Sequence, residues 1–125
     1  MARHIEIGRQ GEDLAAGWLV RHGFSVLHRN WRHGRYEVDI IAGRANVLHF
    51  IEVKTRRSST YGHPEEGVSR KKIEHMLQGA AAWLHKRSVQ HGRWPVYHRV
   101  QYDVLAITLA PGQTPEIVFF EDVYL

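Results

Sequence analysis

The stretch that most constrains the fold is Arg35 to Arg57, RYEVDIIAGRANVLHFIEVKTRR, which reads as two strands joined by a tight connection. Three charged residues, Asp39, Glu52 and Lys54, stand among β-branched neighbours, where strand interiors are usually apolar. Because side chains alternate between the two faces of a strand, Glu52 and Lys54 share one face, and Glu37 shares a face with Asp39. These charges make the hairpin the first candidate for a functional site.

The connection between the two strands falls near Gly43 to Asn46, where Gly and Asn favour a turn. If Ala45 and Asn46 form a two-residue turn, Asp39 lies opposite Glu52, with Cβ atoms about 5 Å apart. A register shifted by one residue would instead put the two carboxylates on opposite faces. Like charges placed opposite each other destabilise a sheet, and a divalent cation is a candidate counter-charge because hard cations bind carboxylate oxygens.

The length and charge of the chain restrict its class. The 125 residues predict a single domain spanning 1–125, and the net charge is +4. Between Arg29 and Arg99 there are 14 Lys and Arg against 6 Asp and Glu, and three of those six are the acidic residues of the hairpin. A basic surround with an acidic centre suggests a polyanion held around a cation, although a solvated basic surface would give the same composition.

The composition also bears on where the protein acts. The absence of cysteine excludes disulfides and thiolate metal sites, and it fits a reducing cytoplasm. No apolar run reaches the roughly 20 residues that a membrane span needs. The N-terminal sequence MARHIEIGRQGED has no apolar signal-peptide core. We therefore expect a cytoplasmic protein without a membrane partner.

Hydrophobic periodicity predicts the elements in the order αβββαββ, which is typical of an α/β fold with a central mixed sheet flanked by helices. Turns are expected at Arg32 to Gly34 and Pro111 to Pro115, and loops at Ser58 to Gly62 and Gln90 to Pro95. Outside the hairpin, the expected elements are a helix at about Ile5–His22, a strand at Phe24–Trp31, a helix at Ser69–Arg87, and strands at Tyr97–Thr108 and Glu116–Phe120.

The second predicted helix has one apolar stripe and one polar face. Ser69 is a suitable N-cap, and the cations in the first turn oppose the helix dipole but can contact phosphate. The stripe comprises Ile73, Met76, Leu77, Ala80 and Leu84, and the residues expected to face out are Lys71, Glu74, His75 and Gln78.

Other chemistry-bearing residues carry weaker signals. The ten histidines show no zinc-site spacing. Trp31, Trp83 and Trp94 are candidates for stacking on bases, although Trp83 lies beside the helical stripe and is better explained as core. Asp103 is interpreted as structural, with a basic partner. Glu12 borders the buried stripe of the first helix, where a favourable helix-dipole position and a functional role are equally good explanations.

Taken together, these motifs resemble the UPF0102 family of YraN-like proteins, within the restriction-endonuclease-like PD-(D/E)xK superfamily, over nearly the whole chain. Two positions depart from the usual family pattern: Tyr36 replaces a Gly, and Gln101 replaces an Arg. The matching residues are Gly8, Gly11, Glu12 and Ala15, Asn30 to Arg32, Glu37 to Ile41, Phe50 to Arg56, Tyr61 to Pro64, Lys72, and Tyr102 to Val104.

This resemblance implies a restriction-endonuclease-like fold and a site for Mg²⁺ or Mn²⁺. Asp39 and Glu52 would hold the metal with the backbone carbonyl of Val53. Glu37 is a candidate further ligand, and Glu12 is similar to a helix glutamate that completes the site in junction-resolving members. Lys54 would orient the attacking water or stabilise charge on the phosphoryl oxygens.

The expected function is divalent-metal-dependent hydrolysis of DNA phosphodiester bonds, with branched or damaged DNA as candidate substrates. Arg32, Arg56 and Lys72 would contact flanking phosphates. A non-catalytic nucleic-acid-binding module with the same fold is the alternative, and an RNA-processing nuclease is a third hypothesis. A homodimer is a further expectation, because cutting two strands calls for two sites.

The structural alternative to a functional site is a surface salt bridge between Lys54 and either Glu52 or Asp39. Such a pair would contribute only about 0–1 kcal/mol to the stability of the fold.

Overall fold

The computed structural model describes residues 2–57, 70–91 and 99–123 and, within these ranges, the side chains of all but residues 2–7, 72–73 and 88–91. The predicted order αβββαββ is confirmed. Ser69, Trp94 and the segment 58–62 lie outside the described residues. The elements are α1 (Ala2–Arg21), β1 (Ser25–His33), β2 (Tyr36–Arg44), β3 (Val47–Arg56), α2 (Arg70–His91), β4 (Arg99–Thr108) and β5 (Glu116–Phe120).

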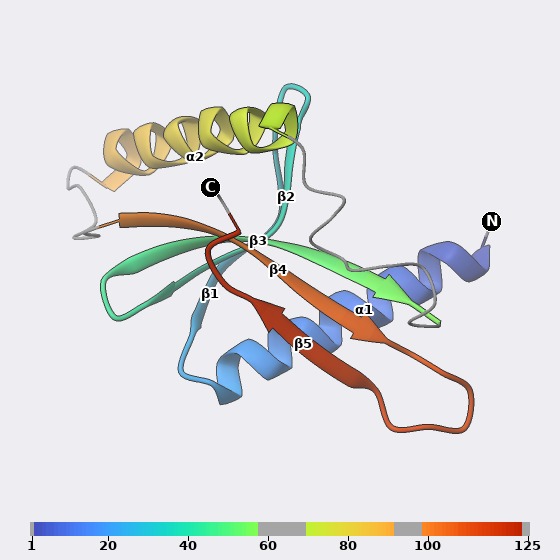
Figure 1. Cartoon of the computed structure of the whole chain (residues 1–125). Helices are drawn as coiled ribbons and strands as arrows, with labels where there is room; N and C mark the ends of the chain where they lie inside the picture. The colour runs from blue at the N-terminus through green and yellow to red at the C-terminus, as the bar shows by residue number, and fades with distance from the viewer. Residues whose placement is uncertain (1, 58–69, 92–98, 124–125) are drawn as a thin grey trace.

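The five strands form one mixed sheet in the order β1-β2-β3-β4-β5. All neighbours are antiparallel except β3 and β4, which are parallel because the chain crosses over through α2 between them. Figure 1 shows α1 on one side of the sheet and α2 on the other. The predicted mixed sheet flanked by helices is therefore confirmed.

The turn between β2 and β3 is the two-residue connection that the sequence predicts. Arg44 pairs with Val47, and the intervening Ala45 and Asn46 have φ angles of +51° and +64°. Positive φ at both central residues is typical of a type I′ turn, whose twist matches that of the flanking strands. The turn fixes the register that brings the acidic ends of the two strands together.

The turn between β1 and β2 differs from the prediction. His33 pairs with Tyr36, so β1 continues through Arg32 and His33, and the turn consists of Gly34 and Arg35. Gly34 has a positive φ of +59°, a conformation that Gly adopts without steric cost. This tight connection lets β1 extend two residues beyond the predicted end at Trp31.

The core has two layers, one under each helix. Strict alternation fails in β2, because Val38 and Ile41 both face α2 whereas Ile40 and Ala42 face α1, and β2 bends strongly in this region (Figure 1). The α2 layer comprises Trp31, Val38, Ile41, Leu48, Phe50, Met76, Ala80, Trp83 and Tyr102. The α1 layer comprises Ala15, Leu19, Phe24, Ile40, Ala42, Ile51, Leu105 and Ile107.

Helix α2 buries a face that is rotated from the predicted stripe. Met76, Ala80 and Trp83 are buried, which confirms Trp83 as a core residue. Leu77, expected in the stripe, is 42% exposed. His75, expected to face solvent, is half-buried and lines a pocket.

A glycine explains why α2 packs in this orientation. A Cβ on Gly79 would lie 3.4 Å from Cζ3 of Trp31 and 3.4 Å from Cβ of Tyr36. The missing side chain therefore lets the helix approach β1 and β2 closely at this point. Trp31 is buried in the resulting interface, so the interpretation of its ring as an exposed base-stacking surface is wrong.

A second glycine sets how closely α1 approaches the sheet, and it yields a testable prediction. A Cβ on Gly11 would lie 1.9 Å from Oγ1 and 2.9 Å from Cβ of Thr55 on β3. We expect Gly11→Ala to lower the free energy of unfolding by about 1–3 kcal/mol, because overpacking outweighs the gain in helix propensity. Urea denaturation measures this change.

The matched control for that experiment lies one turn earlier in α1. A Cβ on Gly8 would meet nothing within 4 Å. Gly8→Ala should therefore raise stability by up to about 1 kcal/mol, the usual difference in helix propensity between Ala and Gly. Equal effects of the two substitutions would contradict the close approach of α1 to Thr55.

Candidate active site

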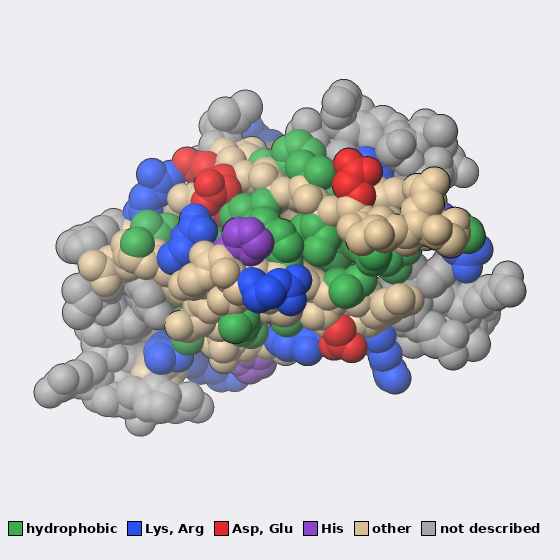
Figure 2. Space-filling model, turned by 90° about the horizontal axis from the view of Figure 1, so that it is seen from below, with side chains coloured by type: hydrophobic (Ala, Val, Ile, Leu, Met, Phe, Trp, Pro, Cys, Tyr) green, Lys and Arg blue, Asp and Glu red, His purple; other side chains and the backbone are tan. Residues whose placement is uncertain are grey.

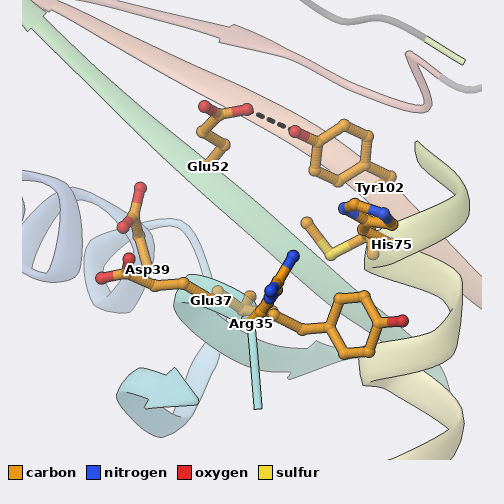
Figure 3. A pocket seen from close by; sticks show the side chains of 9 residues that line it. Arg35, Glu37, Asp39, Glu52, His75 and Tyr102 are labelled. Carbon is orange, nitrogen blue, oxygen red and sulfur yellow. Dashed lines mark hydrogen bonds between the residues drawn. The ribbon is translucent and has the colours of Figure 1, made fainter. Parts of the chain in front are cut away.

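A pocket of about 290 Å³ opens between the bent end of β2, the middle of β3 and β4, and helix α2 (Figure 3). Three of the predicted site residues, Glu37, Asp39 and Glu52, line it. The complete lining consists of Arg35, Tyr36, Glu37, Val38, Asp39, Glu52, His75, Met76 and Tyr102. The predicted acidic residues therefore meet in the same hollow, although they come from different strands.

Asp39 is the most perturbed carboxylate of the pocket. Strand pairing between β2 and β3 ends at Ile40 and Ile51, and beyond it Oδ2 of Asp39 accepts a hydrogen bond of 2.8 Å from the backbone N–H of Val53. Burial raises the pKa of Asp39 to about 6. The Val53 N–H opposes this rise in pKa, whereas the negative charges of nearby glutamates add to it.

Glu52 is held by a residue to which the sequence analysis gave no role in the site. The hydroxyl of Tyr102, on β4, donates a hydrogen bond to Oε2 of Glu52 (Figure 3). Burial, together with this bond and the Glu52 charge, raises the pKa of the Tyr102 hydroxyl far above its ordinary value. Tyr102 therefore remains a proton donor and fixes the orientation of Glu52.

The two other candidate acidic ligands also act on Asp39. The charges of Glu12 and Glu37 both raise the pKa of Asp39, so both side chains lie close enough to act on it. Glu12 is half-buried on α1 and accepts a 3.3 Å hydrogen bond from Nδ2 of Asn30. Glu37 is exposed and forms an ion pair of 3.3 Å with Arg32. The carboxylates thus create a negative field around the half-buried Asp39 carboxyl group.

This donor set fits a divalent cation that retains several waters. Among the side chains described, no three of the His, Asp and Glu residues converge tightly enough to enclose a metal by themselves. Mg²⁺, however, usually binds one or two carboxylates and keeps its remaining ligands as water or substrate phosphate. Asp39 and Glu52, with the Val53 carbonyl that the family resemblance implies, would suffice for such an ion. Burial first, and then the neighbouring carboxylates, raise the pKa of Asp39, and a bound cation would favour the ionised form against both effects.

The remaining predicted residues lie farther along β3 or outside the described side chains. Lys54 is half-buried on β3 and is not part of the pocket lining. Arg56, at the end of β3, is also half-buried. Lys72 belongs to the first turn of α2, but its side chain lies outside the described residues. Arg35 is exposed and lines the pocket, and exposed Arg32 pairs with Glu37, another residue of its lining.

Asp103 has the structural role and basic partner that were predicted. It is fully buried, and its Oδ2 lies 2.5 Å from Nδ1 of His49. Its Oδ1 accepts hydrogen bonds of 2.9 Å from Gln101 and 2.8 Å from the backbone N–H of Asp122. This network ties the segment after β5 to the strand that carries Tyr102.

The outer face on the α1 side does not gather positive charge. In Figure 2, Lys and Arg side chains lie in several separate places on the described part of this face, with Asp and Glu near them. Neither described helix has the length and apolar character that crossing a membrane requires.

The fold and the pocket together define a mixed α/β protein with a partly buried carboxylate centre at the junction of three strands. Comparison with known proteins agrees with the sequence resemblance: a profile described as "Uncharacterised protein family UPF0102" matches residues 11–107. The chain belongs to the UPF0102 family.

Individual relatives match over most of their length. A UPF0102 protein of Phocaeicola vulgatus is 42% identical over 115 residues, which cover 92% of this chain and 88% of the relative. A UPF0102 protein of Rhodococcus opacus is 40% identical over 124 residues, covering 99% of this chain and the whole relative. A more distant one, from Chloroherpeton thalassium, is 31% identical and covers 99% of this chain and 97% of the relative.

Proposed function

We propose that the chain is a divalent-metal-dependent nuclease that hydrolyses phosphodiester bonds of DNA. The observation that supports this best is Asp39, a half-buried carboxyl group whose pKa is raised to about 6 and whose neighbours include three glutamates. Strongly perturbed titratable groups in a cleft are candidates for functional residues. The resemblance of the Glu-x-Asp and Glu-x-Lys motifs to the PD-(D/E)xK superfamily supplies the reaction class.

Each residue of the site would have a distinct task. Asp39, Glu52 and the Val53 carbonyl would hold Mg²⁺ or Mn²⁺, with Glu37 and Glu12 adding negative charge or outer contacts. The metal, when bound, would polarise the phosphate and generate a nucleophilic hydroxide from water.

Residues around the metal ligands would position them and the substrate. Tyr102 keeps the Glu52 carboxylate in place, and the Val53 N–H does the same for Asp39. Lys54 would orient the attacking water or stabilise charge that develops on the phosphoryl oxygens, the role that the family resemblance gives it.

Basic residues near the pocket would bind the flanking phosphates. Arg32 is exposed, and its ion pair with Glu37 can open to release it toward DNA. Arg56 and Lys72 remain proposed phosphate contacts. Such contacts make affinity fall steeply with salt concentration. Cutting both strands would need two copies, so we include a homodimer in the proposal, which sedimentation with and without DNA would test.

The direct test is a cleavage assay with the purified full chain. Duplex, single-stranded, flap and four-way-junction DNA, and RNA, are incubated with Mg²⁺, with Mn²⁺, or with EDTA. We expect metal-dependent cleavage of DNA that falls by about 100- to 1,000-fold in Lys54→Met, the usual cost of losing one group that stabilises transition-state charge. Glu52→Gln should lose at least as much, because it weakens the metal site itself.

The control is an exposed glutamate outside the pocket. Glu121 forms an ion pair with Arg44 and does not line the site, so Glu121→Gln should cleave like the wild type. Residual cleavage that is equal in the wild type, Glu52→Gln and Lys54→Met would indicate a contaminating nuclease and remove the enzyme from the proposal.

A non-catalytic nucleic-acid-binding module is the second candidate. Two observations favour it. Tyr102 already donates a hydrogen bond to Glu52, and no three of the described Asp, Glu and His side chains lie close enough together to hold a metal ion. This alternative predicts DNA binding that is unchanged by EDTA and no cleavage on any substrate of the assay.

A further inference from the structure

The carboxylate pocket has a second wall of different chemistry. Facing the acidic side, the lining includes the rings of Tyr36, His75 and Tyr102 and the thioether of Met76. In Figure 3, Asp39 and Glu37 lie together on one side, whereas His75 and Tyr102 lie on the side of helix α2. A ligand in this pocket would therefore touch charged oxygens on one side and aromatic surface on the other.

We propose that the aromatic wall takes an unpaired nucleobase, so that the substrate class is DNA with a single-stranded or extrahelical nucleotide beside the scissile phosphate. This inference rests on the proposed function for its phosphate chemistry. A neutral base fits the aromatic wall, while the anionic phosphate lies toward Arg35 and the metal side. Bases stacked in a duplex cannot reach such a pocket unless they leave the helix.

The rings extend from the pocket toward the surface. Tyr36 lies 5.1 Å from His75 in an edge-on arrangement and 6.4 Å from His33 with the ring planes only 11° apart. His33 in turn lies 5.9 Å from Trp31, with planes 6° apart, but Trp31 is buried, so the accessible part of the row ends at His33. Near-parallel aromatic rings form a platform on which successive bases stack with little sequence preference.

Tyr36 is held in place before any ligand binds. Its hydroxyl donates a hydrogen bond to Oε1 of Gln78, and its Cβ lies 3.4 Å from the position that a Cβ on Gly79 would take. Tyr36 and His75 are half-buried and belong to neither core cluster, so the core does not account for them. A ring that is already fixed loses little conformational freedom when it binds a base.

The size of the pocket also favours one base over a larger ligand. Its volume of about 290 Å³ lies just below the roughly 300–1,000 Å³ typical of small-molecule sites. The three carboxylates would repel a free anion, whereas a nucleobase carries no charge. Arg35 supplies the positive charge at the mouth that a following phosphate needs.

The test measures binding and does not depend on cleavage. DNA oligonucleotides carrying the fluorescent base 2-aminopurine are prepared as single strands, as duplexes with that base unpaired, and as fully matched duplexes. Each is titrated with the full chain in Ca²⁺ and in EDTA, followed by anisotropy and by 2-aminopurine quenching. We expect tighter binding and stronger quenching for the single strand and the unpaired base than for the matched duplex.

Substitutions then separate stacking from general affinity. Tyr36→Leu should weaken binding to the unpaired-base DNA by about 5- to 150-fold and abolish the quenching, with matched-duplex affinity unchanged. Tyr36→Phe keeps the ring and should retain the preference. His75→Leu should act like a milder Tyr36→Leu, and His85→Leu, at an exposed position of the same helix, should have no effect. Thermal melting confirms that each variant is folded.

The outcomes distinguish this inference from the proposed nuclease activity. A preference for the unpaired base without cleavage of any DNA would support the base pocket and refute the nuclease. Cleavage of matched duplex as efficiently as of unpaired DNA, with no effect of Tyr36→Leu or His75→Leu, would refute the base pocket and leave the nuclease standing. An equal loss of affinity for all DNAs in Tyr36→Leu would also overturn the inference.

Discussion

Replacing Asp39 by Asn is expected to abolish cleavage and, in the same protein, to raise the stability of the metal-free fold above pH 7. The loss of activity should be at least about 1,000-fold, equivalent to about 4 kcal/mol, because the substitution removes a charge that would hold the metal. The gain in stability follows from the cost of keeping an ionised carboxylate buried among other carboxylates.

The pH dependence of this gain has a definite sign. The pKa of Asp39 is about 6 in the folded protein, against an ordinary value of 3.8 for an aspartate in water. Between these values the folded state binds more protons than the unfolded state, so the wild type loses stability as the pH rises through this window. The loss reaches about 3 kcal/mol above pH 7, at about 1.4 kcal/mol per pH unit, and the Asn variant escapes it.

Denaturant unfolding in EDTA at pH 4 and pH 8 measures this effect. The Asn variant should match the wild type at pH 4 and exceed it by up to about 3 kcal/mol at pH 8, or roughly 10 °C in melting temperature. Asn can still accept the hydrogen bond from the Val53 N–H. The control is Asp13→Asn on α1, an exposed carboxylate paired with Arg29, which should change stability by less than about 1 kcal/mol.

Divalent metal should reverse the order of the two proteins. A ligand that binds only the folded state stabilises it by about 2.7 kcal/mol at 100 times its dissociation constant. Mg²⁺ or Mn²⁺ should therefore raise the melting temperature of the wild type at pH 8 and leave Asp39→Asn nearly unchanged. If the wild type gains nothing from either metal, or if Asp39→Asn is less stable than the wild type at pH 8, the metal site proposed here is wrong.

The central hairpin shows how far local sequence determines the site. Ala45 and Asn46 could be predicted as a two-residue turn, and that turn fixes the register by which Asp39 approaches β3. Turn geometry and the period of two are local properties, so residues close in sequence decide them. The bend in β2, which interrupts the alternation between Val38 and Ile40, depends on packing against both helices and has no local signal.

The second wall of the pocket shows where local reasoning ends. Tyr102 reaches Glu52 because β3 and β4 pair in parallel, with Phe50 beside Tyr102 and Glu52 beside Val104. That register joins segments fifty residues apart through the crossover, and hydrophobic periodicity does not encode it. The one available signal was the position of Tyr102, directly before Asp103 in the strand.

Helix α2 illustrates a related limit. Hydrophobic periodicity identified the helix but misplaced the edges of its buried face. It predicted that His75 faces solvent and that Leu77 is buried, whereas in the structure His75 is half-buried in the pocket and Leu77 is exposed. The orientation depends on the close approach at Gly79, which only the partner strands reveal. The position of His75 in the pocket could therefore not be predicted from the sequence.

The buried pair of His49 and Asp103 should be the most sensitive point of the fold. Asp103→Ala is expected to lower the free energy of unfolding by about 3–5 kcal/mol, because it leaves three partners without their acceptor in the interior. Asp103→Asn should cost clearly less, since an amide can accept from Gln101 and Asp122 and donate to Nδ1 of His49 in its other tautomer. Urea denaturation of both variants at pH 7 gives the comparison.

A double substitution tests whether the cost belongs to the pair. His49→Leu alone leaves the Asp103 carboxylate buried without its basic partner, whereas His49→Leu combined with Asp103→Leu removes both polar groups from the α1 side of the sheet. The double variant should lose less free energy of unfolding than the two single variants lose together. Removing one partner leaves the other polar group buried and unpaired, whereas replacing both by apolar side chains does not. Because Asp103 adjoins Tyr102, the single variants should also release Glu52 and weaken metal binding. Strict additivity of the two losses would show that His49 and Asp103 do not act as a unit.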